Sequence, residues 1–343
     1  MTWLTWRQYR LQALIGAVVL AAFAAVMLVT GFQMAAQWHT ILAGCTASGT
    51  CGTLQQGSVS LGGVLGHDFA ILSMLSPVLF GVLVGAPLVA HEFEARTSDF
   101  AWAQSITRIH WLAVKVGWLL LAAAVWGGVI AALVTWWSGP RNAAFADAFQ
   151  VNYFDQQGLV PVAYSVFATA LGIAAGAVLR RTLPAIAIVI GGFLGMRLWI
   201  SQSLRMHFMS PVTTFYSVTG GFNPPAGSAI LNGGLVDKAG QVVTGSSGNV
   251  MTVFIDGVPS TSLPAACQRV LPASASSPAG PGPSNAVLNA VNECLQKAGY
   301  RQFLSYQPIS RYWAFQGIET GIYVAVAAVL IAVTFYAVSR KDA

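Results

Sequence analysis

The chain has 343 residues, of which 55% are hydrophobic and only 8% are charged. Soluble domains carry about 25% charged residues, so this composition excludes an ordinary water-soluble globule and predicts an integral membrane protein with room for one additional domain. The net charge of +6 does not indicate nucleic-acid binding, because no more than two Lys or Arg residues are consecutive anywhere in the chain.

The N-terminal segment MTWLTWRQYR combines aromatic and basic side chains ahead of the first apolar run. Trp3, Trp6, Arg7 and Arg10 suit an amphipathic helix on the inner membrane surface, and the alternative is an ordinary positively charged flank.

Further along, LAGC (42–45) resembles a lipoprotein cleavage box. The polar QWHT separates this box from the apolar run, and the run is long enough to span a bilayer, which favours a retained span over processing.

Six apolar runs reach the roughly 20 residues that a membrane-spanning helix needs: 11–33, 68–90, 114–137, 159–179, 183–203 and 317–338. Long stretches contain no Asp, Glu, Lys or Arg, for example from Arg10 to Asp68 and from Lys115 to Arg141. The Gly and Pro residues inside the runs are typical of membrane helices. The sequence therefore predicts an all-α integral membrane protein with six transmembrane helices.

The distribution of Lys and Arg predicts that both termini are cytoplasmic. With the N-terminus inside, the short external loops 34–67 and 138–158 carry only Arg141, whereas the internal segments carry nine basic residues, namely Arg7, Arg10, Arg96, Arg108, Lys115, Arg180, Arg181, Arg340 and Lys341. The domain boundaries that follow are 1–203 for helices 1–5, 204–316 for an extracellular domain, and 317–343 for helix 6 and a cytoplasmic tail.

The internal loop 91–110 is charged and aromatic between two apolar runs. Thr97 or Ser98 followed by Asp99 predicts the start of a short helix. Phe100, Trp102 and Ile106 are too apolar for a helix that contacts only water. They suit either packing on the membrane surface or docking into a groove on a partner protein.

Residues 204–316 have the composition of a small exposed α+β domain. LVDKAGQVV (235–243) predicts two strands about a turn, VMTVFI (250–255) predicts another strand, and ASASSPAGPGPS (273–284) a flexible linker. The segment 284–299 predicts a helix with one apolar face, made of Val287, Val291, Cys294, Leu295 and Ala298.

All four cysteines lie on the external side in this topology. The simplest pairing is Cys45 with Cys51 and Cys267 with Cys294, and crossed pairings that tie the first loop to the insert stay open. No CxxC or paired His motif supports metal binding instead.

Two charged residues fall within apolar runs, Arg197 in the fifth and Glu319 in the sixth. Such charges are costly in a membrane and tend to be functional. They predict either a structural ion pair, with snorkelling of Arg197 as a variant, or a polar lining of a translocation path.

The aromatic residues before the sixth run favour an interfacial belt over a ligand-binding mouth: Tyr300, Phe303, Tyr306, Tyr312, Trp313 and Phe315.

No catalytic motif is found in the sequence. A nucleotide-hydrolysing P-loop needs Gly-Lys followed by Ser or Thr, and none of the four lysines follows a Gly. HExxH and GxSxG are also absent, and the five histidines are scattered along the chain. The sequence predicts a chain that is not itself an enzyme.

Several segments together resemble the membrane permease subunits of ABC-2 type transporters, in particular the actinobacterial short form: MTWLTWRQYR, APLVAHEFEARTSDFAWAQSITRIHWLAVK (86–115), VTWW (134–137), LRRTLP (179–184) and YQPISRYWAFQGIETGIY (306–323). This resemblance implies an N-terminal interfacial elbow helix at residues 2–10 and a coupling helix in the loop after the second span. In such permeases the coupling helix begins with acidic residues followed by Gly-Thr. Glu92, Glu94 and Thr97 match that pattern, and Arg96 stands where Gly is usual.

The resemblance implies the membrane-spanning half of an ABC exporter for an apolar or amphipathic substrate, with two copies of a cytoplasmic ATPase and a second permease copy as partners. ATP and Mg would bind the ATPase, and this chain would bind no cofactor. One alternative is an ABC complex that transmits force or a signal to an envelope partner through the insert. The other is an ATP-independent secondary transporter, for which we find no internal repeat.

Overall fold

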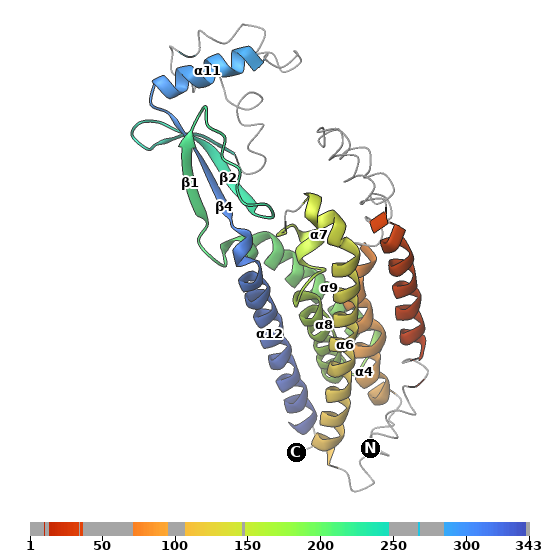
Figure 1. Cartoon of the computed structure of the whole chain (residues 1–343). Coiled ribbons are helices and arrows are strands. Elements are labelled where there is room, and N and C mark those ends of the chain that lie inside the picture. The colour runs from red at the N-terminus through yellow and green to blue at the C-terminus, as the bar shows by residue number, and fades with distance from the viewer. Residues whose placement is uncertain are drawn as a thin grey trace. The chain divides into compact units, whose positions relative to one another are not determined.

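The structure is a computed structural model that describes residues 10, 14–33, 35–36, 71–94, 107–145, 148–246, 267 and 285–340. The chain divides into two compact units (Figure 1). Unit 1 comprises Met1–Phe145, Gln150–Arg205 and Trp313–Ala343, and unit 2 comprises Ala146–Phe149 and Met206–Tyr312. Unit 2 is thus an insertion between two helical parts of unit 1.

Unit 1 is built from helices that are long and apolar. Five described helices are long enough to cross a membrane: Leu14–Gln33, Ile109–Ser138, Val160–Leu179, Thr182–His207 and Ile309–Ser339. They coincide with five of the six predicted runs. The remaining run contains a shorter apolar helix, Ile71–Gly85.

The helical elements of unit 1 are named here as they are labelled in Figure 1, where there is room for a label. After the α-helical residues 71–80 come the π-helix η1 (Gly81–Gly85) and α4 (Ala86–Glu94). The others are α6 (Arg108–Phe145), α7 (Val151–Phe154), α8 (Val160–Leu179), α9 (Thr182–Trp199), the π-helix η2 (Ile200–Leu204), the 3-10 helices η3 (Arg205–His207) and η7 (Ile309–Arg311), and α12 (Tyr312–Arg340).

Helix α8 is the central helix of unit 1, because 72% of its apolar window is buried against at most 33% in the other four. It contacts η1, α4, α6 and α9. Glycines allow its backbone to approach η1 and α4 closely: a Cβ added at Gly172 would lie 2.7 Å from the Ala86 N atom, and one added at Gly81 would lie 2.7 Å from the Ala168 carbonyl oxygen. Small residues four apart, such as Gly172 and Gly176, are the usual means of close helix packing in membranes.

Unit 2 contains a four-stranded antiparallel sheet of order β1-β4-β2-β3. The strands are β1 (Val212–Ser217), β2 (Ala229–Val236), β3 (Val242–Ser246) and β4 (Arg301–Gln307). The β2–β3 hairpin and the helix α11 (Asn285–Lys297) agree with the sequence prediction. Predicted strand 250–255 lies outside the described residues.

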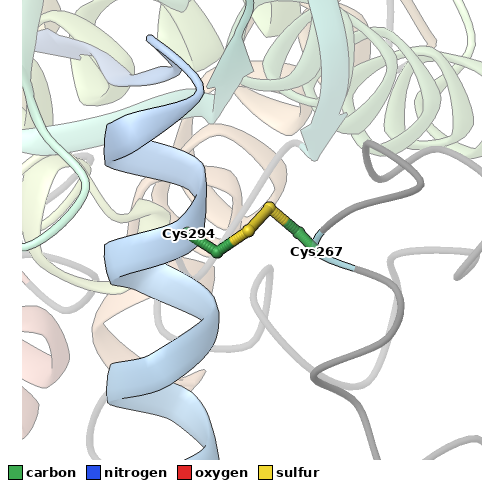
Figure 2. Close-up of a disulfide and its surroundings, with 2 residues drawn as sticks. All are labelled: Cys267 and Cys294. Atoms are coloured by element: carbon green, nitrogen blue, oxygen red, sulfur yellow. A yellow bond between two sulfur atoms is a disulfide. The ribbon is translucent and has the colours of Figure 1, made fainter.

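Helix α11 packs its predicted apolar face on the sheet. Val291 and Leu295 join Val218 and Leu235 in a buried cluster. Cys294 of α11 forms a disulfide with Cys267, with an S–S distance of 2.00 Å (Figure 2). This is the pairing named above as the simplest for these two cysteines, whereas Cys45 and Cys51 lie outside the described residues.

Three of the six aromatic residues assigned to an interfacial belt are buried inside the protein, and the belt itself stays a prediction. Phe303 and Tyr306 are buried in β4, where Tyr306 contacts the ring of Phe222. Phe315 is fully buried, whereas Trp313 is exposed. The prediction missed β1 and β4 because the two strands pair across more than 80 residues, which no local pattern reveals.

Candidate functional site

Unit 1 contains a buried cluster of four charged side chains, which we call the charge cluster: Asp155, Arg197, Arg205 and Glu319. Their exposed fractions are 4%, 7%, 0% and 0%. Asp155 follows α7, Arg197 lies in α9, Arg205 begins η3, and Glu319 lies in α12. The cluster therefore joins three separate parts of unit 1, and its two positive and two negative charges balance.

Arg205 is the centre of the charge cluster. Its Nε and Nη2 atoms each donate to a different carboxylate oxygen of Glu319 at 2.9 Å. The same Nη2 also donates to Asp155 Oδ1. Two parallel bonds between a guanidinium and a carboxylate form the strongest kind of side-chain ion pair, so this pair ties the end of the α9–η3 segment to α12.

Arg197 holds the other side of Asp155. Its Nε and Nη2 donate to Asp155 Oδ2 at 2.9 and 2.8 Å. Tyr164 of α8 donates its hydroxyl to Glu319 Oε1 at 2.8 Å. These bonds replace water around charges that would otherwise be very costly to bury.

The π-helix η2 explains why both arginines reach the same cluster. Arg197 and Arg205 are eight residues apart, with η2 between them. A π-turn takes up roughly one residue more than an α-turn, so one turn of each spans about eight residues. An uninterrupted α-helix would leave residues eight apart about 80° from each other around the axis, so the π-turn brings the two arginines closer to alignment on one face.

The guanidinium of Arg205 also lies over the Phe154 ring, 4.3 Å from its centroid. Its Nη1 atom has no hydrogen-bond partner among the described residues. The ring face offers the guanidinium a favourable electrostatic surface. The cluster is thus a set of paired charges in which one guanidinium lies over an aromatic ring.

A second buried polar contact flanks the charge cluster. Gln316 Oε1 accepts from the backbone N–H groups of Leu159 and Val160 at 3.0 Å each, and Gln316 Nε2 donates to the Phe154 carbonyl at 3.0 Å. Gln316 therefore supplies acceptors for the first turn of α8, whose N-cap residue forms no side-chain bond. This contact fixes α12 to the start of α8.

The structure places both predicted intramembrane charges in the charge cluster but does not pair them with each other. Arg197 binds Asp155, and Glu319 binds Arg205. The sequence analysis missed Asp155 and Arg205, because each lies just beyond the edge of an apolar run and resembles a loop residue. The signal for Arg205 is its spacing of eight residues from Arg197, which falls within one helical stripe, whereas Asp155 has no such signal.

Among the predicted coupling residues, the structure describes the side chain of Glu94. Its Oε1 accepts from the Thr182 backbone N–H and its Oε2 from the Thr182 hydroxyl, both at 2.8 Å. These bonds hold the pKa of Glu94 below its ordinary value, chiefly through the Thr182 backbone N–H. The contact joins the last residue of α4 to the first residue of α9.

The other predicted site residues are placed only in part. Glu92 is helical in α4 and Arg10 is helical. The following lie outside the described residues: Trp3, Trp6, Arg7, Arg96, Thr97, Asp99, Phe100, Trp102 and Ile106. Within the described ranges no group of three His, Cys, Asp or Glu side chains could hold a metal ion.

Among protein families, the one described as ABC-2 membrane transporter related matches residues 17–205, more than half of the chain. The match ends at Arg205, which is also the last residue of unit 1 before the main part of unit 2, Met206–Tyr312. No curated protein and no solved structure matches the chain significantly.

Proposed function

The chain belongs to the ABC-2 membrane transporter related family, and from this premise we propose that it is the membrane-spanning permease subunit of an ABC exporter. It moves an apolar or amphipathic substrate outward, using ATP that a separate cytoplasmic ATPase hydrolyses. The observation that carries the proposal is the family match over 17–205, together with five helices long enough to cross a membrane.

We propose six spans with both termini in the cytoplasm of a bacterial cell. The span that is not among the five long helices is the second, and within it residues 71–90 are helical without a break, through η1 into α4. At 1.5 Å per residue this stretch is about 30 Å long, which matches a bilayer core of about 30 Å. In this topology unit 2 is extracellular, which agrees with its disulfide.

The proposed complex has two ATPase subunits and two permease subunits, either identical or related. ATP and Mg bind the ATPases. Closure of the ATPase pair pushes on the coupling segment after Glu94 and shifts helices between two arrangements. Arg197 and Glu319 remain candidates for the translocation path, now together with Asp155 and Arg205, because separating these pairs would place charged groups on the path.

The test is to co-express the chain with candidate ABC-type ATPases of the same bacterium, to purify any complex that forms, and to assay inverted vesicles made from it. The expected result is co-purification and ATP-dependent uptake of amphipathic dyes into the vesicles. A complex that hydrolyses ATP without moving any such probe would indicate force transmission through unit 2. Absence of an associated ATPase would overturn the proposal.

A further inference from the structure

Glu94 connects two helices that are adjacent in space but 88 residues apart in sequence. Its carboxylate binds both hydrogen-bond donors of Thr182, the backbone N–H and the side-chain hydroxyl, at 2.8 Å each. Glu94 is also the last described residue before 95–106, the segment in which the sequence predicts the coupling helix. The segment is covalently joined to Glu94 at one end and to Thr107 at the other.

Helix α9 lacks a cap of its own. Its N-cap residue, Arg181, has an extended backbone and forms no side-chain capping bond. The carboxylate of Glu94 takes that place from outside the helix, where the N-terminal end of the helix dipole favours a negative charge. The first turn of α9 therefore depends on a side chain that α4 carries.

The connection between α8 and α9 is short, which limits how α9 can respond. Arg180 ends α8 with a φ of 54°, and its N–H donates to the Gly176 carbonyl at 2.9 Å. Only Arg180 and Arg181 lie between the two helices. A connection of two residues permits little independent movement. A displacement of Thr182 is therefore expected to move α9 as a whole and not to be taken up by a flexible loop.

The far end of the same helical segment reaches the charge cluster. The segment Thr182–His207 is helical throughout and carries Arg197 and Arg205. These arginines bind Asp155 after α7 and Glu319 in α12. This continuous helical segment is thus bound by Glu94 at its first residue, Thr182, and by the charge cluster at its last turns.

From this arrangement we infer that Glu94 is a positioning residue for ATP coupling, which transmits movement of the segment after α4 into α9 through its two bonds to Thr182. The inference rests on the proposed permease function and adds to it the specific joint and the helix that moves. The competing explanation is that Glu94 only stabilises the first turn of α9. The two explanations differ in what happens when α9 is given a cap of its own.

The experiment measures a distance in the complex with its ATPase. Spin labels are placed at Ile190→Cys on α9 and Leu121→Cys on α6, both exposed in the structure, in a Cys45→Ser/Cys51→Ser background. In the otherwise unchanged complex, trapping with ATP and vanadate is expected to shift the distance between the labels. Glu94→Ala is expected to abolish the shift in complexes that retain the ATPase, and loss of the ATPase from this variant would make Glu94 a docking residue and overturn the inference.

Variants at Arg181 and Thr182 separate coupling from stability. Arg181→Ser introduces an N-cap residue within α9 itself, so Glu94→Ala/Arg181→Ser is expected to regain thermal stability without regaining the shift. Arg181→Ser alone, which keeps Glu94, is expected to retain the shift. Thr182→Ser keeps both donors and should behave like the unchanged chain, whereas Thr182→Val loses the hydroxyl and should reduce the shift.

Each outcome has a distinct consequence. A full shift in Glu94→Ala, or its recovery in Glu94→Ala/Arg181→Ser, overturns the inference and identifies Glu94 as a cap only. A complex that forms but shows no shift without the Glu94 substitution overturns the inference and leaves the ATPase partnership standing. If no ATPase associates with the unchanged chain, the proposed function fails, and the inference fails with it.

Discussion

Arg205 and Glu319 are 114 residues apart in the sequence, yet two parallel hydrogen bonds of 2.9 Å join them inside unit 1. Arg205 is the last residue of unit 1 before the chain enters unit 2, and Glu319 follows soon after its return at Trp313. The pair therefore holds together the two points between which unit 2 is inserted. A fixed pair of ends is the condition under which an insertion disturbs its host least.

Arg205→Met is expected to be strongly destabilising, because it leaves Glu319 without its cation and Asp155 with only Arg197. Removing one partner of a buried pair typically costs about 3–5 kcal/mol. The measurement is thermal unfolding of the purified protein in one detergent. Arg205→Met/Glu319→Gln should recover part of the loss, since the uncompensated carboxylate is then gone. A melting temperature unchanged in the single variant would contradict this role for Arg205.

A charge exchange between Arg197 and Glu319 is expected not to restore stability. If the two residues formed a direct pair, Arg197→Glu/Glu319→Arg would recover it. In the structure, however, the exchange would place a carboxylate against Asp155 and a guanidinium against Arg205. The double variant should therefore be at least as unstable as the worse single variant. Yield and melting temperature of the three proteins decide the matter, and recovery in the double variant would refute the observed pairing.

Gly172→Ala is expected to loosen the contact between α8 and the η1–α4 segment. The added Cβ would lie 2.7 Å from Ala86 N and 2.9 Å from Gly81 O, and backbone atoms cannot easily give way. Overpacking of this kind costs about 1–3 kcal/mol. The matched control is Gly195→Ala in α9, where nothing lies within 4 Å of the added atom. The control should be neutral or slightly stabilising, and equal melting temperatures for both variants would argue against close packing at Gly172.

Loss of the Cys267–Cys294 disulfide is expected to weaken unit 2. The bridge closes a loop across 27 positions of sequence separation, for which the chain-entropy estimate is about 3–4 kcal/mol. Cys267→Ser/Cys294→Ser should therefore speed hydrogen exchange of the amides in α11 and β4 while leaving those of α8 unchanged. Cys45→Ser/Cys51→Ser provides the control for general loss of cysteine. Unaltered exchange in α11 would show that the bridge contributes little.

Much of the helical unit could be predicted from the sequence, because a bilayer demands long apolar runs and tolerates few charges. Five of these runs coincide with helices long enough to span a membrane. The β2–β3 hairpin was predictable for a local reason as well, since the turn DKAG separates its strands. Such features depend on neighbouring residues only.

The partners in the charge cluster could not be predicted in the same way. Asp155 precedes α8 in the sequence, and η2 shifts the helical phase by about one residue, which helps to align Arg205 with Arg197. Likewise, β4 pairs with β1 across the whole of unit 2. These contacts depend on how distant segments meet, and single-sequence patterns carry little information about that.

Glu94 should make the stability of the protein depend on pH in the acidic range. Its hydrogen bonds from Thr182 favour the ionised carboxylate and lower its pKa below the ordinary value of 4.5, with smaller contributions from His91 and Arg181 and against some opposition from burial. When a carboxyl group has a lower pKa in the folded protein than in the unfolded protein, its ionisation stabilises the folded state. This stabilisation is fully present at a pH above the pKa in the unfolded state, and it is lost as the pH falls through the pKa in the folded state. The difference in melting temperature between the unchanged protein and Glu94→Ala should therefore be constant above pH 4.5 and shrink below it. A difference that grows on acidification would contradict the assignment of Glu94 as an ionised acceptor for both donors of Thr182.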